Sequence, residues 1–201
     1  NQGEKIALLG RDATALTAFF NVVAGKTQPD GGNIEFGKTI NAGYLPNEND
    51  EYFTGKGDLD LINWLRQYSE DPDEQFIRGF LGRMLFSGEE VLKQASVLSG
   101  GEKVRCMLSK IMLTHPNFIL MDEPTNHLDL EAITALNNAM SDFKGNMIFT
   151  SHDHKLTETV ANRIIEITPN GIIDSLMNFD DYLRSDAIHA QRDELYAGVP
   201  A

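Results

Sequence analysis

The sequence predicts a mixed α/β fold with a mostly parallel sheet, and three observations support this prediction. Mainly apolar runs at 5–9, 118–121 and 147–150 have the length and hydrophobicity of strands that are buried on both faces. Apolar residues at helical spacing follow the first two of these runs. A turn signal divides the segment 163–175 into two short strands, which predicts an antiparallel hairpin at one edge.

Length and composition predict a single domain over 1–201 and exclude several classes of protein. Hydrophobic residues make up 41% of the chain and charged residues 23%, which is typical of a soluble globular domain. No apolar run approaches the roughly 18 residues of a membrane span, and no signal-peptide pattern is present. The net charge of -13 argues against nucleic-acid binding by electrostatics alone. Cys106 is the only cysteine, so no disulfide forms within the chain.

The stretch 118–129 carries the strongest chemical signal. Asp122 and Glu123 stand directly after a buried strand, and open α/β sheets bind ligands at the carboxyl ends of their strands. Asp122 is a candidate ligand of Mg²⁺, and Glu123 is a candidate general base for a water that attacks a phosphate. Pro124 ends the strand and Asp129 is placed to cap the next helix. Taken alone, the two acids would be interpreted as a solvated acidic turn.

Two further stretches place these acids in a specific context. Upstream, the run 98–102 reads Leu-Ser-Gly-Gly-Glu and opens a helix that Ser99 caps. Downstream, the run 150–153 reads Thr-Ser-His-Asp and closes the next apolar strand, with His152 at the carboxyl edge of the sheet. An imidazole there can hydrogen-bond a terminal phosphate, whereas His154 lacks such a setting and is expected at the surface.

Together and in this order, the stretches resemble the ATP-binding cassette (ABC) family. They match its signature motif at 98–102, its Walker B strand with catalytic carboxylate at 118–123, and its switch histidine at His152. The run 123–129, Glu-Pro-Thr-Asn-His-Leu-Asp, covers the D-loop and looks most like the ABC-F branch. Members of that branch are soluble twin-cassette proteins, and many act on the ribosome. The resemblance therefore implies ATP and Mg²⁺ as cofactors, a second cassette and the ribosome as partners, and a cytoplasmic location.

The resemblance also implies roles for individual residues. ATP would lie between the phosphate loop of one cassette and the signature helix of the other. Glu123 would act as general base, and His152 would sense the γ-phosphate. The residues of the signature motif and the D-loop that are expected to contact the nucleotide are Ser99, Gly100, Gly101, Glu102 and Asp129.

The segment 10–18 has the strand, loop and helix context of a phosphate-binding loop, but it departs from the expected pattern. Gly10 and Thr17 match, whereas Ala15 replaces the second glycine and Leu16 replaces the lysine. The leucine brings no charge to the outer phosphates, but backbone N–H groups at the helix start still favour an anion. Thr17 remains a candidate Mg²⁺ ligand; the alternative is an ordinary strand-turn-helix unit. The expected loop residues are Gly10, Asp12, Ala13, Thr14, Ala15, Leu16, Thr17 and Ala18.

Asn47 corresponds to the glutamine that, in cassettes, reaches the Mg²⁺ ion and the attacking water. Asparagine keeps the amide but is one methylene shorter, so a plain surface asparagine is an equally good interpretation. The resemblance divides the chain into a nucleotide-binding core at 1–50 and 99–183, a helical subdomain at 51–98 and a loose tail at 184–201.

Local patterns add expectations within these parts. Alternating residues predict strands at 33–36 and 39–45. A helix is predicted to start after Asp58 or Asp60, and Ser87 with Glu90 forms a capping box for a further short helix.

The aromatic residue that stacks on adenine in cassettes comes from a strand before the phosphate loop, and only nine residues precede Gly10. We therefore expect the second cassette of an ABC-F protein, without its first strands. Two alternatives remain: a catalytically silent regulatory or scaffold module, favoured by Leu16, and the ATPase subunit of a membrane transporter. Asn126 and His127 in the D-loop argue against the transporter.

Overall fold

The computed structural model describes residues 2–198 and contains one six-stranded sheet in the order β2-β3-β4-β1-β5-β6. The first five strands of that order are parallel to their neighbours, and β6 runs antiparallel to β5. This confirms the predicted α/β class with a mostly parallel sheet and an antiparallel hairpin at one edge. The strands are β1 (Lys5–Gly10), β2 (Ala42–Leu45), β3 (Phe118–Asp122), β4 (Asn146–Thr150), β5 (Arg163–Thr168) and β6 (Gly171–Ser175).

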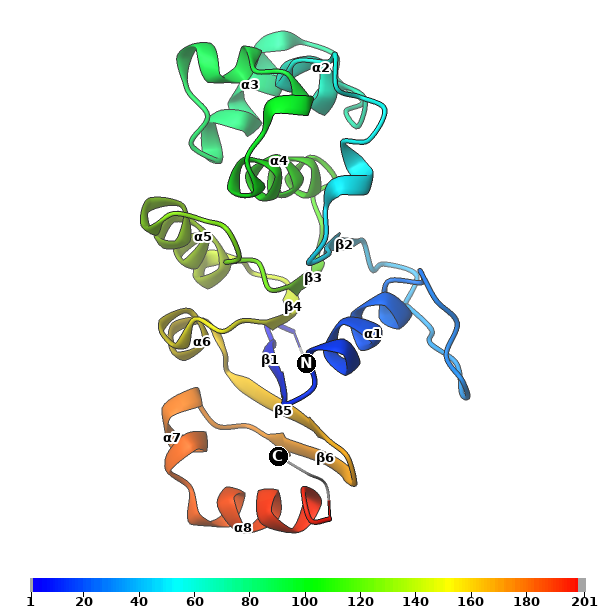
Figure 1. Cartoon of the computed structure of the whole chain (residues 1–201), viewed down its shortest axis with the longest axis vertical. Coiled ribbons are helices and arrows are strands. Elements are labelled where there is room, and N and C mark those ends of the chain that lie inside the picture. Colours follow the sequence, from blue (N-terminus) through cyan, green and yellow to red (C-terminus); the bar gives the residue numbers. More distant parts are fainter. Residues whose placement is uncertain (1, 199–201) are drawn as a thin grey trace.

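Helices cover both faces of the sheet, with α1 on one side and α5 and α6 on the other (Figure 1). Side-chain caps define where most helices begin; Asp60, Ser99 and Asp129 each accept a backbone N–H of the first turn. The helices are α1 (Ala13–Val23), α2 (Leu61–Arg66), α3 (Glu74–Arg83), α4 (Gly100–Leu113), α5 (Leu130–Asp142), α6 (His154–Val160), α7 (Phe179–Arg184) and α8 (Asp186–Leu195). Three 3₁₀ turns complete the set: η1 (Asp50–Tyr52), η2 (Gly88–Leu92) and η3 (Ala95–Val97).

A helical lobe formed by α2, α3 and the 3₁₀ turns lies at one end of the molecule, above α4 (Figure 1). Trp64 is fully buried at its centre, where its ring stacks on Phe53 at a centroid distance of 4.7 Å. Its indole N–H donates to the Tyr52 carbonyl at 3.0 Å, so the one polar group of the buried ring has a hydrogen-bond partner. A separate small core of Leu8, Leu16, Phe20 and Leu120 joins α1 to the sheet.

Two predictions about local structure are wrong. Residues 33–36 form no strand, and the predicted strand 39–45 is shortened to β2. Ile34 and Phe36 alternate as strand residues do, but they remain largely exposed and pair with no strand among the described residues. Alternation without a partner ladder does not make a strand.

The tail at 184–201 is not loose over its described part. Residues 186–195 form α8, and the buried side chains of Ile188 and Tyr196 pack it against the hairpin end of the sheet. Residues 199–201 lie outside the described part. Among the described residues, no helix combines the length and hydrophobicity that crossing a membrane requires.

Candidate functional site

The topology places three strand ends beside one another. β3, β4 and β1 are adjacent and parallel, so their carboxyl ends meet at one edge of the sheet. Gly10 closes β1, and Asp122 and Thr150 face each other in register at the ends of β3 and β4. Residues that are far apart in the sequence therefore form one site, as the sequence predicted from the position of the two acids.

Asp122 is almost completely buried, and two threonine hydroxyls satisfy its carboxylate. Thr17 Oγ1 donates to Oδ2 at 2.8 Å, and Thr150 Oγ1 donates to Oδ1 at 3.1 Å. Burial raises the pKa of the Asp122 carboxyl above its ordinary value, although both hydrogen bonds oppose that rise. The pairing of Thr17 with Asp122 sets two oxygens side by side. Mg²⁺ is commonly held by one or two carboxylates together with substrate phosphates, so these residues fit that ion.

Glu123 is held in a fixed position by its backbone and by the loop after β4. It adopts a left-handed backbone conformation with φ of 52°, and its N–H donates to Thr150 Oγ1 at 3.0 Å. Its Oε2 accepts the backbone N–H of His152 at 3.1 Å, and the His152 ring nitrogen Nε2 lies 3.5 Å from Oε1. The Glu123 side chain is 12% exposed and that of His152 87%, so the carboxylate is fixed while the imidazole is free to meet a ligand.

The surroundings of Glu123 change the pKa of its carboxyl in the direction that favours a general base. Burial raises the pKa of its carboxyl; the nearby His152 lowers that pKa, and the charge of Asp122 raises it again. A carboxylate with a raised pKa is a stronger base than an exposed glutamate.

The phosphate loop differs from the expectation in how its backbone is used. The Asp12 carboxylate caps α1 and accepts the N–H groups of Thr14 and Ala15 at 2.9 and 3.3 Å. Two of the N–H groups expected to favour an outside anion are therefore already occupied by an internal one. Leu16 is mostly buried in the small core and only its edge reaches the neighbouring cleft; a Cβ added at Gly10 would lie 3.1 Å from its Cδ2.

The signature residues lie against the D-loop of the same chain. Ser99 and Glu102 form a reciprocal capping box at the start of α4. A Cβ at Gly100 would lie 3.0 Å from the His127 ring, and one at Gly101 would overlap the His127 carbonyl oxygen. Gly101 is therefore required for this close approach, and a side chain at Gly100 would need the His127 ring to shift, a reason that the sequence did not reveal.

Of the remaining predicted site residues, Asp129 and Asn47 make hydrogen bonds within the chain, whereas Ala18 is exposed. Asp129 caps α5 by accepting the N–H of Ala132 at 2.8 Å. Asn47 accepts a hydrogen bond from Asn126 Nδ2 at 3.2 Å, which ties the segment after β2 to the D-loop. Asn47 is not bonded to Thr17 or Asp122, and Ala18 is exposed on α1.

Comparison with known proteins identifies the family. A family profile described as "ABC transporter" matches residues 1–126. The chain belongs to the ATP-binding cassette family. It is 57% identical over 198 residues to the ABC transporter ATP-binding protein YkpA of Bacillus subtilis (strain 168), covering 98% of this chain and 36% of that protein. The chain thus spans about a third of the length of this relative.

Two solved structures share the fold. A dimeric ATP-binding cassette bound to ADP and Pi matches with a TM-score of 0.66 and 17% identity, covering 83% of this chain and 82% of that one. A complex of an archaeal ribosomal stalk protein with the ribosome recycling factor aABCE1 matches with a TM-score of 0.64 and 23% identity, covering 83% of this chain and 32% of that one.

Two clefts open on either side of the phosphate loop of the cassette. The larger, of about 650 Å³, is lined by Ala13, Thr14, Thr17 and Asn47 among others. The smaller, of about 230 Å³, is lined by Gly10, Leu16, Glu123 and His152 among others. The candidate metal ligand Asn47 and the candidate base Glu123 therefore open onto different clefts, with the loop between them.

Thr150 belongs to the candidate site by its contacts, although its sequence pattern did not single it out. It bonds Asp122 through its side chain and also accepts the backbone N–H of Glu123. The available signal was its position at the end of a buried strand directly beside the strand that carries Asp122.

We expect Asp122→Asn to stabilise the free chain at neutral pH. Because the folded-state pKa of Asp122 is raised, wild type loses stability as pH rises from the unfolded pKa through the folded one. The amide removes that loss, and each kcal/mol recovered raises Tm by about 2–4 °C. Thermal unfolding at pH 7 and at pH 3 tests this, with the gain present only at pH 7. The exposed cap variant Asp129→Asn serves as control and should show no such pH-dependent gain; equal gains for both variants would contradict the prediction.

Proposed function

We propose that this chain is one cassette of an ABC-F type protein that binds and hydrolyses ATP together with a second cassette. The observation that carries the proposal is the pairing of Asp122 with Thr17 and of Glu123 with His152 at one edge of the sheet. Those pairs place a candidate metal-binding carboxylate beside a fixed base, and attack of water on a phosphate requires both groups.

The chemistry follows from the geometry of these side chains. When bound, Mg²⁺ would neutralise phosphate charge, and Thr17 and Asp122 would hold it. Glu123 would accept the proton of the attacking water, while the exposed imidazole of His152 would donate a hydrogen bond to the terminal phosphate.

A second cassette would complete the nucleotide site. The Ser99 side chain and the Gly100 backbone lie exposed at the start of α4, where an outside phosphate can approach them. Related chains are long enough for more than one such domain, and a structural neighbour is described as a dimeric cassette. In a head-to-tail pair, Ser99, Gly100 and Gly101 would therefore contact the ATP held by the partner's loop.

The proposed site of action is the ribosome, in the cytoplasm. The Glu-Pro-Thr-Asn-His-Leu-Asp run supports an ABC-F protein, and one structural neighbour is a ribosome recycling factor. Sedimentation of the intact two-cassette protein with purified ribosomes tests this proposal, and we expect ATP to increase the bound fraction relative to ADP. Copurification with an integral membrane subunit, without ribosome binding, would favour the transporter alternative.

A silent scaffold module is the second candidate function, and the phosphate loop is the observation that favours it. Asp12 occupies two backbone donors, and Leu16 offers no cation. The same chain keeps Glu123 and His152 in contact, however, and a module without turnover has no chemical need for that pair.

A further inference from the structure

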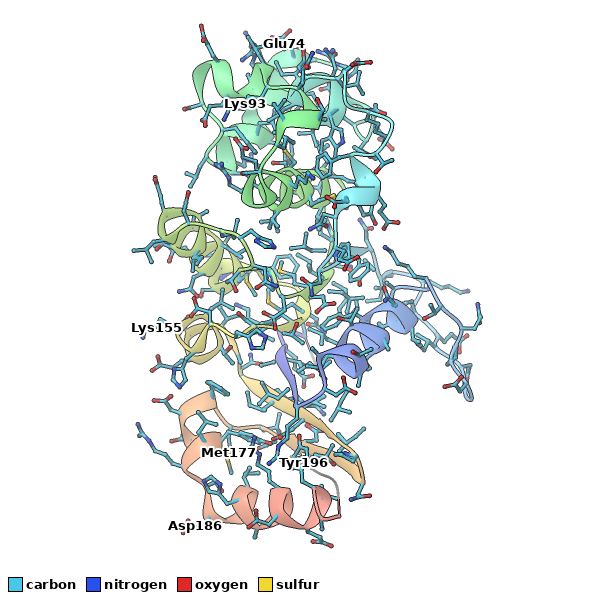
Figure 2. All side chains as sticks on the ribbon, in the orientation of Figure 1. Glu74, Lys93, Lys155, Met177, Asp186 and Tyr196 are labelled. Carbon is cyan, nitrogen blue, oxygen red and sulfur yellow. The ribbon has the colours of Figure 1, made fainter. Side chains whose placement is uncertain are left out.

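Arg11 directly follows the first glycine of the phosphate loop and is held by an aromatic ring. Its guanidinium carbon lies 3.9 Å from the centre of the Tyr196 ring, which follows the last turn of α8. Within residues 2–198, Arg11 forms no ion pair with a carboxylate. Figure 2 shows Tyr196 on the side of α8 that faces the sheet, where the chain's C-terminal part meets the start of the loop.

The Tyr196 ring is itself fixed by a buried carboxylate. Its hydroxyl donates to Glu166 Oε1 at 2.9 Å, and Glu166 is 1% exposed. Glu166 also accepts the Tyr182 hydroxyl at 2.6 Å and the Arg192 Nε at 3.1 Å. Because Arg192 balances its charge, Glu166 does not need Arg11 as a counter-ion. Glu166 pairs in register with Leu9, so this network lies directly beside the start of the loop.

Arg11 keeps its hydrogen-bond donors accessible to a ligand. The residue is exposed, and the contact with Tyr196 is made to the ring of that residue rather than to a hydrogen-bond acceptor. The guanidinium N–H donors match phosphate oxygens in a bidentate fork. Arg11 also lines the cleft of about 230 Å³ that contains Gly10, Leu16 and His152. Of the two arginines on that cleft, Arg192 is committed to Glu166, which leaves Arg11 as the cation open to a ligand there.

We infer that Arg11, held against Tyr196, supplies the positive charge that binds the nucleotide phosphates at this loop, in place of the missing lysine. This inference rests on the nucleotide binding in the proposed function. It gives the C-terminal segment a role: Tyr196 is a positioning residue for Arg11, and Arg11 is the residue that meets the phosphate.

The test is binding of MgATP and of inorganic tripolyphosphate to this chain, measured by calorimetric titration. Arg11→Ala should weaken binding of both ligands by roughly tenfold, because both present the phosphates and only one carries adenosine. Tyr196→Ala should weaken binding to a similar degree. Tyr196→Phe keeps the ring under Arg11 but loses the hydroxyl bond to Glu166 that fixes the ring, so it should weaken binding by less than Tyr196→Ala.

A double mutant separates positioning from general damage to the fold. If Tyr196 acts through Arg11, adding Tyr196→Ala to Arg11→Ala should cause no further loss of affinity. In a Leu16→Lys background, Arg11→Ala should cost little, because the lysine supplies the charge. Additive losses in the double mutant, or unchanged affinity in Arg11→Ala, would overturn the inference, as would a wild-type chain that binds neither ligand. The measurement uses a single chain, so failure of cassette pairing or ribosome binding would leave its result unaffected.

Discussion

Replacing Ser99 with arginine should reduce steady-state ATP hydrolysis by the intact two-cassette protein by about 10²-fold, the typical loss when one donor to a developing oxyanion is removed. Ser99 is exposed at the start of α4, and in the proposed head-to-tail pair its backbone and hydroxyl would meet the terminal phosphate of the partner's ATP. Arginine fills that space and prevents closure of the two cassettes. ATP-driven closure, followed by a distance probe between the cassettes, should be lost in parallel.

Ser99→Arg should be compared with Thr17→Ala in the same steady-state ATPase assay. In the proposed function Thr17 would contact the nucleotide of its own loop, where Asp12 occupies two backbone donors and Leu16 offers no charge, so its loss should reduce the rate much less. Ser99→Ala is the control for the lost helix cap, which costs about 0.5–2 kcal/mol of stability but adds no bulk. If Thr17→Ala is as damaging as Ser99→Arg, the nucleotide site at this chain's loop contributes as much as the site that its signature helix completes. The expectation that the two sites contribute unequally would then be wrong.

The parts of the fold that the sequence predicted correctly depend on local signals. The buried strands at 118–122 and 146–150 are built on the apolar runs 118–121 and 147–149, and their ends follow from a proline or a change to polar residues. Helix starts at Asp60, Ser99 and Asp129 follow from side chains that bond the first turn within three residues. Because the strands are parallel, their carboxyl ends meet, so the position of Asp122 and Glu123 could also be predicted.

The failures depend on contacts between distant parts of the chain. The segment 33–36 has strand-like alternation but no partner ladder in the described structure. The tail at 186–195 is polar in sequence, yet Tyr196 and Arg192 fix it to Glu166 through bonds that no local pattern indicates. The Asp12 cap is local by contrast: its carboxylate accepts the N–H groups of Thr14 and Ala15, two backbone donors that an outside anion would otherwise meet.

Leu16→Lys should tighten MgATP binding by this cassette by roughly ten- to a hundredfold. A charge-assisted contact to phosphate contributes about 1.5–3 kcal/mol, and leucine supplies none of it. The Leu16 side chain lines the cleft that contains Glu123 and His152. A lysine stem can pack on Leu8 and Phe20 as the leucine does, while its longer tip extends the ammonium into that cleft.

Leu16→Met is the matched control, because it keeps volume and adds no charge, and it should leave affinity unchanged. The base and the imidazole are already in place, so the restored loop should also turn over ATP, and Glu123→Gln in the same background should abolish that gain.

The acid limb of the pH–rate profile for this gained activity should lie above the ordinary glutamate range because burial raises the pKa of Glu123. His152→Ala should move that limb to still higher pH, since His152 lowers this pKa. Unchanged affinity in Leu16→Lys would contradict this prediction, and it would mean either that Arg11 already supplies the charge or that Ala15 or the capped backbone disables the loop.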